Sequence, residues 1–564
     1  MRSDNWEIGE FDRNTAIAFC RDGINPLVSV FLASRKVNDI GEARSIIGYD
    51  PREFHDPFLM ADMDKAVKRI KKAIKNKERI AIYGDYDVDG MTSVTVFAIW
   101  LKKEKAEFEI YIPGRFDEGY GLNKTALDML KSHGTDLVIT VDCGITAIEE
   151  ALHAEAIGLD LIITDHHECR DILPKACAVV DPKRSDCNYP YKSLAGVGVA
   201  FKLICALEGD YLSDDIFNIY GESVATGTVA DVMPVIGENR DLIRRGLHMM
   251  NLKPGPGMRS LLREVNIAPG NITASTISFM IAPRLNAAGR MGKTELSVEL
   301  LLTEDIKKAE MLSEELCRLN NERRELEQKI YEDAAAMMHD PEPNEPIILA
   351  RHGWYQGVTG IVAAKMAERY KLPAIIISID EDGMGRGSCR SYGSFAIYDA
   401  LCTCEDLLDN YGGHEMAAGV TIPENNIAEF QKRLNEYYHN NITGTTGSGL
   451  KIDFEVEKPE LLNIPNIEAL EQLEPFGNGN PPPCLCIKEA VVTSLQSIGT
   501  GKHSKLKIEK SGKIIDCIFF SVPVEDLNIK EGNHVDIAFE PQVNEFKGRS
   551  SVQLQLSDIK MSNS

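Results

Sequence analysis

The sequence has no run of about 18 apolar residues that could form a transmembrane helix, and its first residues lack the apolar core of a signal peptide. Its 13 cysteines are scattered along the chain, and without a secretion signal this favours free thiols over a disulfide framework. These features predict a cytoplasmic protein with no membrane contact.

Basic residues are also in deficit. The chain has 62 Lys and Arg against 86 Asp and Glu, a net charge of −24 at pH 7. Affinity for nucleic acids usually comes from neutralising phosphates, so the charge by itself favours a small-molecule substrate. A nucleic-acid enzyme with this charge would need its basic residues concentrated along a narrow groove, or would bind weakly and in a salt-sensitive way.

The rest of the composition is typical of globular proteins, with 43% apolar and 26% charged residues. A length of 564 residues predicts three or four domains, each able to bury its own core. Between residues 80 and 182, short apolar runs alternate with helical patterns. This alternation predicts an α/β fold with a parallel, doubly wound sheet.

Three acids follow the first predicted strand. Residues 80–83 are uncharged and β-branched or aromatic apart from one alanine, and Asp85, Asp87 and Asp89 come directly after them, ahead of a helical pattern at 91–103. Carboxylates two residues apart repel each other, and a chain keeps such a cluster most readily if a cation binds there. The alternative is a solvated acidic loop. The position at the carboxyl end of a strand favours a site, because ligands of open α/β sheets bind there.

Two later strands end in the same way. Residues 137–141 run into Asp142, and residues 161–164 run into Asp165, His166 and His167. If the three strands are parallel neighbours, these groups converge on one edge of the sheet. Carboxylates with imidazole suit Mn²⁺, Zn²⁺ or Fe²⁺ better than Ca²⁺. Alone, His166 would more often be a core or capping histidine; behind a strand-terminal acid, a ligand is favoured.

The second half of the chain predicts further domains. Residues 305–338 have apolar positions at three–four spacing and no Gly or Pro, which predicts a helix of roughly 50 Å that acts as a strut. Its coiled-coil potential leaves dimerisation open. A Pro-rich boundary at 340–346 precedes a second α/β unit with strands 347–350 and 374–378 and helices 360–370 and 396–408. A flexible linker at 441–449 precedes several short strands with a period of two, which predict a small β-barrel.

Several segments could bind phosphate. The Gly-rich loop 113–122 carries Arg115, although it could equally be a tight turn. Residues 385–391 offer hydroxyl and guanidinium groups, and residues 412–419 offer glycine N–H groups and an imidazole. The arginines at 284 and 290 would neutralise phosphate, or are structural loop residues.

Four segments carry a resemblance to a known family. Asp-Tyr-Asp-Val-Asp-Gly at 85–90, Val-Asp-Cys-Gly at 141–144, Asp-His-His at 165–167 and Ala-Asp-Val at 230–232 are similar to the four motifs of the DHH phosphoesterases. Within that family the chain most resembles the single-strand-specific 5′→3′ DNA exonucleases. One departure is Tyr355, where similar chains often carry histidine, and no role is assigned there.

The resemblance implies a domain division. It comprises a DHH catalytic domain, a connecting helix, a DHH-associated substrate-binding domain and an OB-fold-like nucleic-acid-binding domain, at residues 51–304, 305–340, 341–441 and 450–564. Residues 1–50 mix a few helical turns with an extended segment, and this pattern by itself predicts an N-terminal extension that covers the first domain. The alternative for the last domain is a packing module that only supports the core.

The resemblance also implies site residues. Two divalent ions, Mn²⁺ first and Mg²⁺ as an alternative, would be held by Asp85, Asp87, Asp89, Asp142, His166 and Asp231. By position alone, Asp231 is an ordinary capping or surface acid. His167 would hydrogen-bond the scissile phosphate or orient the cluster, and the residues implied in catalysis are Asp87, Asp142, His166 and His167. The implied substrate contacts are Arg115, Arg284, Asn286, Arg290, Ser388, Arg390, Ser391, Gly412, Gly413 and His414.

The implied function is a metal-dependent exonuclease of DNA repair and recombination. It would release 5′-mononucleotides from single-stranded DNA in the 5′→3′ direction, with a helicase and a single-strand-binding protein as possible partners. One alternative is a DHH enzyme for short oligoribonucleotides or nucleotide phosphates, which the acidic charge fits. The other is a catalytically silent DNA-binding scaffold, which loss of a ligand position would favour; all six positions carry ligand-capable side chains.

Overall fold

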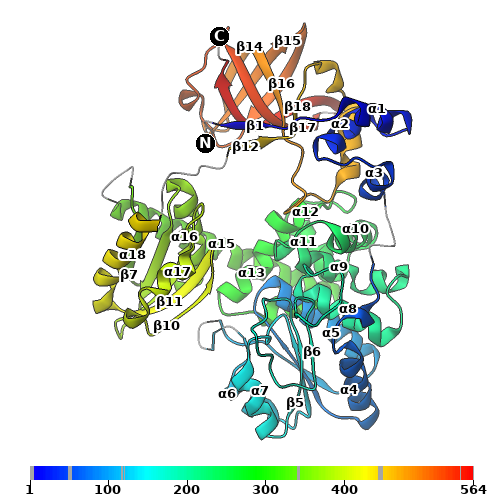
Figure 1. Ribbon diagram of the computed structural model, residues 1–564, viewed down its shortest axis with the longest axis vertical. Helices are drawn as coiled ribbons and strands as arrows, with labels where there is room; N and C mark the ends of the chain where they lie inside the picture. Colours follow the sequence, from blue (N-terminus) through cyan, green and yellow to red (C-terminus); the bar gives the residue numbers. More distant parts are fainter. Residues whose placement is uncertain are drawn as a thin grey trace. The chain divides into compact units, whose positions relative to one another are not determined.

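The computed structural model describes residues 5–48, 54–115, 118–119, 121–338, 343–441, 449–546 and 548–562. The chain divides into two compact units, one formed by residues 54–446 and the other by residues 1–53 together with 447–564 (Figure 1). Most of the predicted linker at 441–449 and residues 340–342 of the predicted boundary at 340–346 lie outside the described residues. No described helix is both long and apolar enough to cross a membrane.

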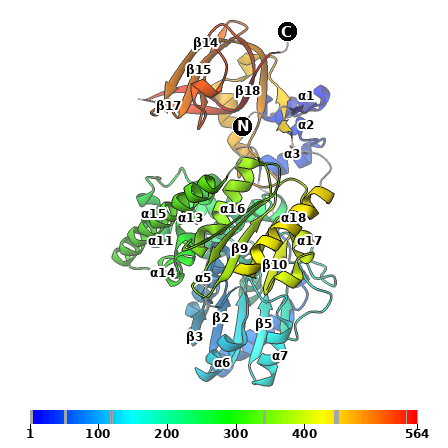
Figure 2. The same ribbon diagram turned by 90° about the vertical axis from the view of Figure 1, so that its left-hand side faces the viewer.

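The larger unit begins with a five-stranded parallel sheet in the order β3-β2-β4-β5-β6. Its elements are α4 (Met63–Asn76), β2 (Ile80–Gly84), α5 (Val88–Lys103), β3 (Phe108–Tyr111), α6 (Lys124–Ser132), β4 (Leu137–Val141), α7 (Ile148–Ala156), β5 (Asp160–Thr164) and β6 (Ala178–Val180). Alternate strand residues face two different apolar cores: Ile82 packs toward the core that contains α4 and α5, and Tyr83 toward the one that contains α6 and α7. Figure 2 shows α6 and α7 beside the strands. Helices on both faces confirm the predicted doubly wound fold.

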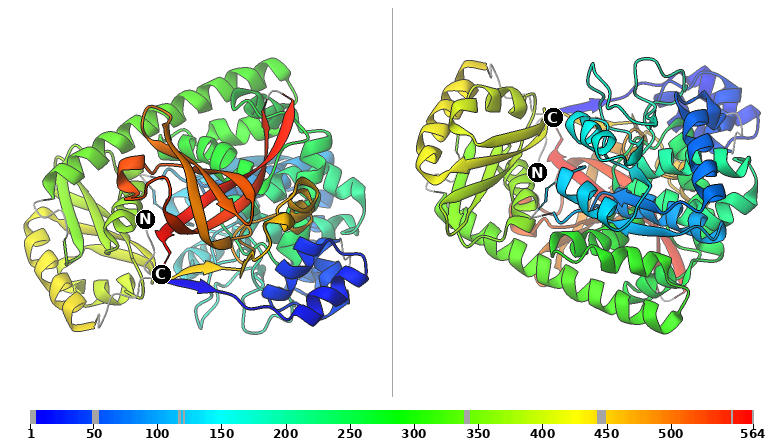
Figure 3. Two further views of the ribbon diagram at one scale, coloured as in Figure 1. Left: turned by 90° about the horizontal axis from the view of Figure 1, so that it is seen from above. Right: turned by 90° about the horizontal axis from the view of Figure 1, so that it is seen from below.

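A helical layer follows the sheet and ends in one long helix. Its elements are α8 (Gly196–Glu208), α9 (Asp214–Ala230), α10 (Gly237–Leu252), α11 (Pro256–Glu264), α12 (Ala274–Thr276), a π-helical turn (Ile277–Ile281), α13 (Ala282–Arg290), α14 (Glu295–Leu302) and α15 (Ile306–Met337). Helix α15 is the long green helix of Figure 3. Its apolar residues divide between two cores: Leu312 and Leu316 pack in the core of the parallel sheet, whereas Ile330 and Ala334 pack against α16.

The same unit continues into a mixed sheet in the order β10-β11-β9-β8-β7. Its elements are β7 (Ile347–His352), α16 (Gln356–Tyr370), β8 (Ala374–Ile379), β9 (Met384–Arg390), α17 (Ile397–Cys402), β10 (Asn410–His414), β11 (Ala417–Pro423) and α18 (Ile427–Asn441). The prediction of one helix over 396–408 is wrong, because α17 ends at Cys402 and a separate 3₁₀ turn follows at Glu405–Leu407.

The smaller unit contains a closed barrel. The strands β14 (Leu485–Ile498), β15 (His503–Lys510), β16 (Lys513–Phe519), β18 (Arg549–Met561) and β17 (His534–Phe546) pair in that order, and β17 returns to β14. This closure leaves no open edge and confirms the predicted OB-like barrel. Short pieces complete the unit: β12 (Leu450–Ile452), β13 (Phe454–Glu455) and α19 (Ile464–Glu468).

The first helices of the chain belong to this barrel unit. Helices α1 (Arg13–Arg21), α2 (Pro26–Ser34) and α3 (Ile40–Ile47) share its apolar core, and β1 (Trp6–Ile8) pairs with β12. Arg35 Nε also lies 2.9 Å from Asp453 Oδ1. The prediction that residues 1–50 cover the first α/β domain is therefore wrong: their apolar faces are buried against a segment more than 400 residues later in the chain.

Candidate active site

The acidic cluster lies where the order of the parallel sheet reverses. The chain passes from β2 outward to β3 and then returns to β4 on the other side of β2, so β2 and β4 flank the topological switch point. Asp85 follows β2, and Asp142 follows β4, both less than 5% exposed. Open α/β sheets bind their ligands in this crevice.

One group of carboxylates forms directly at the two strand ends. Ligand-capable oxygens of Asp85, Asp87 and Asp142 lie within 4.8 Å of one another. Asp87 also caps α5, because its Oδ1 accepts a hydrogen bond of 3.0 Å from Gly90 N. The Oδ1 atoms of Asp85 and Asp142 are buried without a hydrogen-bond donor among the described residues. Buried carboxylate oxygens normally have a partner, so these two are free to hold a cation.

A second group adjoins the first. Atoms of Asp89, His166 and Asp231 lie within 4.8 Å of one another, with His166 Nε2 at 3.8 Å from Asp89 Oδ2 and 3.7 Å from Asp231 Oδ2. The same nitrogen lies 3.1 Å from Asp142 Oδ1, and Asp142, His166 and His167 form a third such group that links the other two. Asp231 is the C-cap of α9, and the fold brings this isolated acid to the cluster.

The ring of His166 is oriented for ligation. Its Nδ1 lies 3.1 Å from the carbonyl oxygen of Leu194 and donates to it, which leaves the lone pair of Nε2 facing the carboxylates. Burial, followed by the neighbouring His167, lowers the pKa of His166 to about 3. The imidazole is therefore neutral at physiological pH, as a metal ligand must be.

Asp89 is anchored by a helix N-terminus. Its two oxygens accept hydrogen bonds from Gly196 N at 2.7 Å and Val197 N at 2.8 Å, at the start of α8. Both carboxylate oxygens retain further lone pairs that can face a cation. A Cβ at Gly196 would lie 2.5 Å from Asp142 Oδ1, so only glycine lets α8 approach the cluster this closely.

Asp165 is a site residue that the sequence reasoning did not assign. It is 1% exposed, and its oxygens accept hydrogen bonds from Ile145 N at 2.8 Å, His166 N at 2.7 Å and His167 Nδ1 at 2.7 Å. Burial lowers the pKa of His167, but the hydrogen bond and charge of Asp165 outweigh it and raise that pKa to about 9. His167 is thus a cation that Asp165 holds at Nδ1. Asp165 comes directly after β5, and this position is the signal in the sequence that could have identified it as a site residue.

The cluster carries more negative charge than its surroundings neutralise. Burial first, and then neighbouring carboxylates, raise the pKa of Asp85, Asp89 and Asp142 well above the usual value, and that of Asp231 to about 7. The cationic side chains that act in the opposite direction, His167, Arg115 and Lys183, do not offset the four carboxylates. The buried oxygens without donors, the neutral imidazole and the oxygen-rich donor set fit a divalent cation.

Arginines gather beside this cluster. The pKa of Arg290 is lowered to about 10 by burial and then by the charges of Arg115, Arg323 and Arg390, and Asp87 acts on it in the opposite direction. Arg290 Nη1 donates to the carbonyl of Gly357 at 3.2 Å, which connects α13 with the start of α16. The guanidinium carbon of Arg115 lies 4.8 Å from the centre of the Tyr86 ring. Tyr86 stands between Asp85 and Asp87 in the sequence. Guanidinium groups that lie close together in spite of burial and mutual repulsion are typical of an anion site.

Two further predicted substrate contacts have positions that fit this arrangement. Ser388 Oγ lies 3.0 Å from Thr359 Oγ1. A Cβ at Gly360 would lie 3.3 Å from Arg390 Nη2. Strand β9 therefore holds the Ser388 hydroxyl and the Arg390 guanidinium beside the start of α16. Asn286 is four residues before Arg290 on α13 and shares its helix face.

The remaining predicted contacts stay predictions, and the structure shows only their local surroundings. Arg284 donates to Met280 O at 2.6 Å, and the Ser391 hydroxyl donates to the carbonyl of Phe395 within its own loop. Gly412, Gly413 and His414 are exposed on β10, the edge strand of the mixed sheet.

The family models identify the class of protein. The DHH family N-terminal domain matches residues 79–228, the DHHA1 domain matches residues 344–440, and the RecJ OB domain matches residues 452–558. The doubly wound sheet with its strand-terminal cluster is therefore the N-terminal domain of a DHH-family protein, and the mixed sheet is its DHHA1 domain.

Curated relatives and solved structures narrow the assignment. The chain is 38% identical to the single-stranded-DNA-specific exonuclease RecJ of Bacillus subtilis, over 99% of this chain and 71% of the relative, and 34% identical to that of Dickeya dadantii, over 97% and 98%. The crystal structure of Thermus thermophilus RecJ in complex with Mn²⁺ superposes with a TM-score of 0.82 at 27% identity, over 99% of this chain and 80% of that one. The chain belongs to the RecJ family.

Proposed function

We propose that this protein is a metal-dependent exonuclease that degrades single-stranded DNA from the 5′ end and releases 5′-mononucleotides. The observation that carries the proposal is the buried cluster at the switch point, with its two donor-free carboxylate oxygens beside gathered arginines. The full-length similarity to RecJ exonucleases supports the substrate and the reaction.

The cluster would hold two divalent ions. Asp85, Asp87 and Asp142 form one donor group, and Asp89, His166 and Asp231 form the other, with Asp142 near enough to serve both. Mn²⁺ is the first choice and Mg²⁺ the second, and related structures contain either ion. When bound, the ions would supply a more acidic water and neutralise charge on the reacting phosphate.

The side chains of the protein would hold the substrate at this centre. His167, a cation fixed by Asp165, would donate from Nε2 to a non-bridging oxygen of the scissile phosphate. Arg115, Arg290 and Arg390 would bind the adjacent phosphate and, with Ser388, set the register of the strand. Of the other contacts implied by the family, Asn286 fits this role, and Gly412, Gly413 and His414 would have to reach the strand from β10.

The remaining parts of the chain would guide the strand. We assign residues 51–304 to catalysis, 305–340 to the connecting helix, 341–441 to substrate binding and 450–564 to single-strand binding by the barrel. We further propose a role in DNA repair and recombination in the cytoplasm, alongside a helicase and a single-strand-binding protein. The 13 cysteines, all free thiols, fit a reducing compartment.

Two alternatives are less well supported. An oligoribonucleotide or nucleotide phosphodiesterase would fit the net charge of −24, but the match of residues 452–558 to the RecJ OB domain argues for a longer strand. A catalytically silent scaffold would not need to keep two complete donor groups.

The test is digestion of a long single-stranded DNA, labelled at either the 5′ or the 3′ end, with Mn²⁺, with Mg²⁺ and with EDTA. We expect early release of the 5′ label as a mononucleotide, abolished by EDTA and by Asp142→Asn. Early release of the 3′ label would overturn the polarity. Turnover confined to RNA of two to five nucleotides would favour the first alternative, and no turnover with metal bound would favour the second.

A further inference from the structure

The strand β3 is an open edge of the catalytic sheet. It pairs with β2 on one side, and no strand among the described residues pairs with it on the other. Its side chains are not fully covered, since Ile110 is 36% exposed. The opposite edge strand, β6, differs because all three of its residues are buried. Exposed edges invite pairing with another chain, and proteins usually block them with proline, lysine or a bulge; β3 itself contains none of these.

The free backbone groups of this edge can be identified from the register. Ile80 N donates to Glu107 O at 3.1 Å, and Ile80 pairs with Phe108 in a parallel ladder. In such a ladder alternate residues bond to the same neighbour, so residues 107, 109 and 111 face β2. The N–H and C=O groups of Phe108 and Ile110 therefore point away from the sheet.

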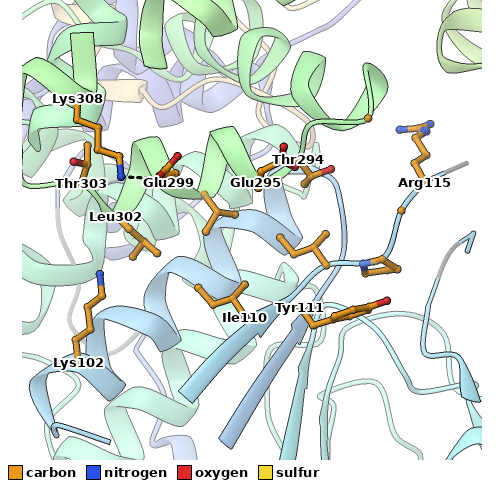
Figure 4. Close-up of a pocket in the computed structure, with 15 residues that line it drawn as sticks. Lys102, Ile110, Tyr111, Arg115, Thr294, Glu295, Glu299, Leu302, Thr303 and Lys308 are labelled. Carbon is orange, nitrogen blue, oxygen red and sulfur yellow. Dashed lines mark ion pairs between the residues drawn. The ribbon is translucent and has the colours of Figure 1, made fainter. Parts of the chain in front are cut away.

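A groove runs along this edge. Its volume is about 700 Å³, and it lies between β3 and helix α14, as Figure 4 shows. The central lining is apolar and comes from both walls: Ile110, Ile112, Pro113, Val298 and Leu302. A cleft between an open strand edge and a helix is the geometry in which an extended peptide adds a strand, with main-chain hydrogen bonds on one side and side-chain pockets beneath.

The charges at the ends of the groove select the occupant. Lys102 lies at one end, exposed and with no carboxylate paired to it among the described residues, and Lys308 lies near it in an ion pair with Glu299. Arg115 lies at the other end (Figure 4). A short peptide with an acidic residue near one end can place its carboxylate at Lys102. A polyanion is less suitable, because Glu295 and Glu299 also line the groove.

We propose that this groove binds an extended segment of a partner protein that adds a strand to β3. The segment would carry apolar side chains at alternate positions and an acidic residue opposite Lys102. Because the groove ends at Arg115, a bound partner would lie next to the nuclease centre without occupying it. This proposal does not depend on the identity of the nuclease substrate.

The test begins with a phage-displayed library of random dodecapeptides, panned against the full chain. We expect an enriched family with apolar residues at alternate positions and at least one Asp or Glu. A synthetic member, labelled with fluorescein, is then titrated by fluorescence anisotropy against the protein and three variants.

The variants distinguish backbone pairing with β3 from nonspecific binding of the peptide. Ile110→Pro removes one N–H that points into the groove and none that pairs with β2, as edge strands tolerate. Lys102→Glu reverses the charge of the unpaired lysine. Lys75→Glu reverses an exposed lysine of α4, which packs beside β6, and is the matched control. We expect at least about 10-fold weaker binding for the first two and no change for the third, with unaltered melting temperatures and nuclease kcat.

Three results would overturn the proposal. The first is the absence of any enriched sequence family. The second is binding that Ile110→Pro and Lys102→Glu leave unchanged. The third is competition by single-stranded DNA together with a raised KM for DNA in both groove variants, which would assign the groove to the substrate strand.

Discussion

His166 Nε2 lies 3.1 Å from Asp142 Oδ1, although both atoms present lone pairs. The other ring nitrogen already donates to Leu194 O, so a hydrogen bond between the two requires a proton on the carboxyl group. Burial and the charges of Asp89, Asp87 and Asp85 raise the pKa of Asp142 and favour that proton in the metal-free protein. A divalent ion would displace it and satisfy both atoms.

The first prediction follows from this pair. Asp142→Asn should lower nuclease activity by about 100-fold or more, because the substitution removes a ligand, a larger loss than that of an outer-shell partner. Metal-free stability should stay equal or rise, since an amide replaces a buried carboxyl without the repulsion. Thermal unfolding in EDTA and with increasing Mn²⁺ measures both effects. An Mn²⁺-dependent rise in melting temperature equal to that of the parent would contradict the assignment.

The second prediction uses two glycines of one helix. A Cβ at Gly196 would lie 2.5 Å from Asp142 Oδ1, whereas the three atoms nearest to a Cβ at Gly198 would be side-chain atoms of Leu194, at 3.4 Å or more. Gly196→Ala should reduce activity and Mn²⁺ affinity by about 10-fold or more. Gly198→Ala is the control, expected to keep activity and to gain up to about 1 kcal/mol in stability from helix propensity. Equal activity of the two variants would show that α8 does not position the cluster.

The third prediction concerns pH. Asp181 is fully buried after β6, its Oδ2 has no donor among the described residues, and burial raises its pKa to about 7. Between pH 4 and 7 the folded state therefore holds a proton that the unfolded state has lost, and its contribution to the unfolding free energy falls as pH rises. Asp181→Asn should remove this dependence and stabilise the metal-free protein at pH 7.5 by roughly 2–4 kcal/mol.

Urea unfolding in EDTA at pH 4.5, 6.0 and 7.5 measures this dependence. Asp171→Asn, at an exposed position, serves as the control and should leave the curve of the parent unchanged. Parallel curves for Asp181→Asn and the parent would mean that Asp181 is already ionised in the folded protein.

The sequence contains the strand-terminal ligands but not the groups that hold them. Asp85, Asp142 and His166 were predictable, because apolar runs that alternate with helices imply parallel strands whose carboxyl ends meet. Leu194 orients His166 through its backbone carbonyl. Gly196 binds Asp89 through its N–H group and lets α8 approach Asp142 because it has no side chain. No residue pattern in the sequence identifies such backbone roles. Asp231 required the family resemblance, since the end of a helix gives no sign of what lies opposite.

The sequence also did not predict which distant segments pack together. Nothing in residues 13–47 indicates whether their apolar faces cover the nearby sheet or a barrel that begins after residue 480. The structure places them on the barrel, where Phe19, Leu27 and Phe31 share its apolar core. Local periodicity predicts that a helix has a buried face but not which surface covers it.

The fourth prediction tests the arginine group. Arg390→Ala should raise the KM for single-stranded DNA by about 10-fold with a smaller effect on kcat, because it removes a phosphate contact made before the chemical step. The dependence of log KM on log salt should decrease by about 0.7, the value for one contact with a single strand. Lys432→Ala, at an exposed position on α18, is the control. An unchanged salt dependence in Arg390→Ala would exclude direct contact with the strand.

The fifth prediction concerns a buried ion pair away from the cluster. Lys202 and Glu238 are fully buried and paired, with Tyr189 OH donating to Glu238 Oε2 at 2.6 Å and Lys202 Nζ donating to His55 O at 2.8 Å. Removing one partner leaves an uncompensated buried charge, so Glu238→Gln and Lys202→Met should each cost about 3–5 kcal/mol. The double variant should lose less than the sum, because neither charge remains.

Urea unfolding of the metal-free protein measures these costs. Lys103→Met breaks the half-exposed pair with Glu208 and should cost at most about 1 kcal/mol, which makes it the control for loss of a surface pair. Folded Glu238→Gln should retain Mn²⁺ binding, because Glu238 is bonded to His55, Tyr189 and Lys202, which are not ligand groups. If both single variants cost no more than Lys103→Met, the pair tolerates a missing partner and water must reach it. If they cost 3 kcal/mol or more, the protein depends on this charge pair between α8 and α10 for its stability.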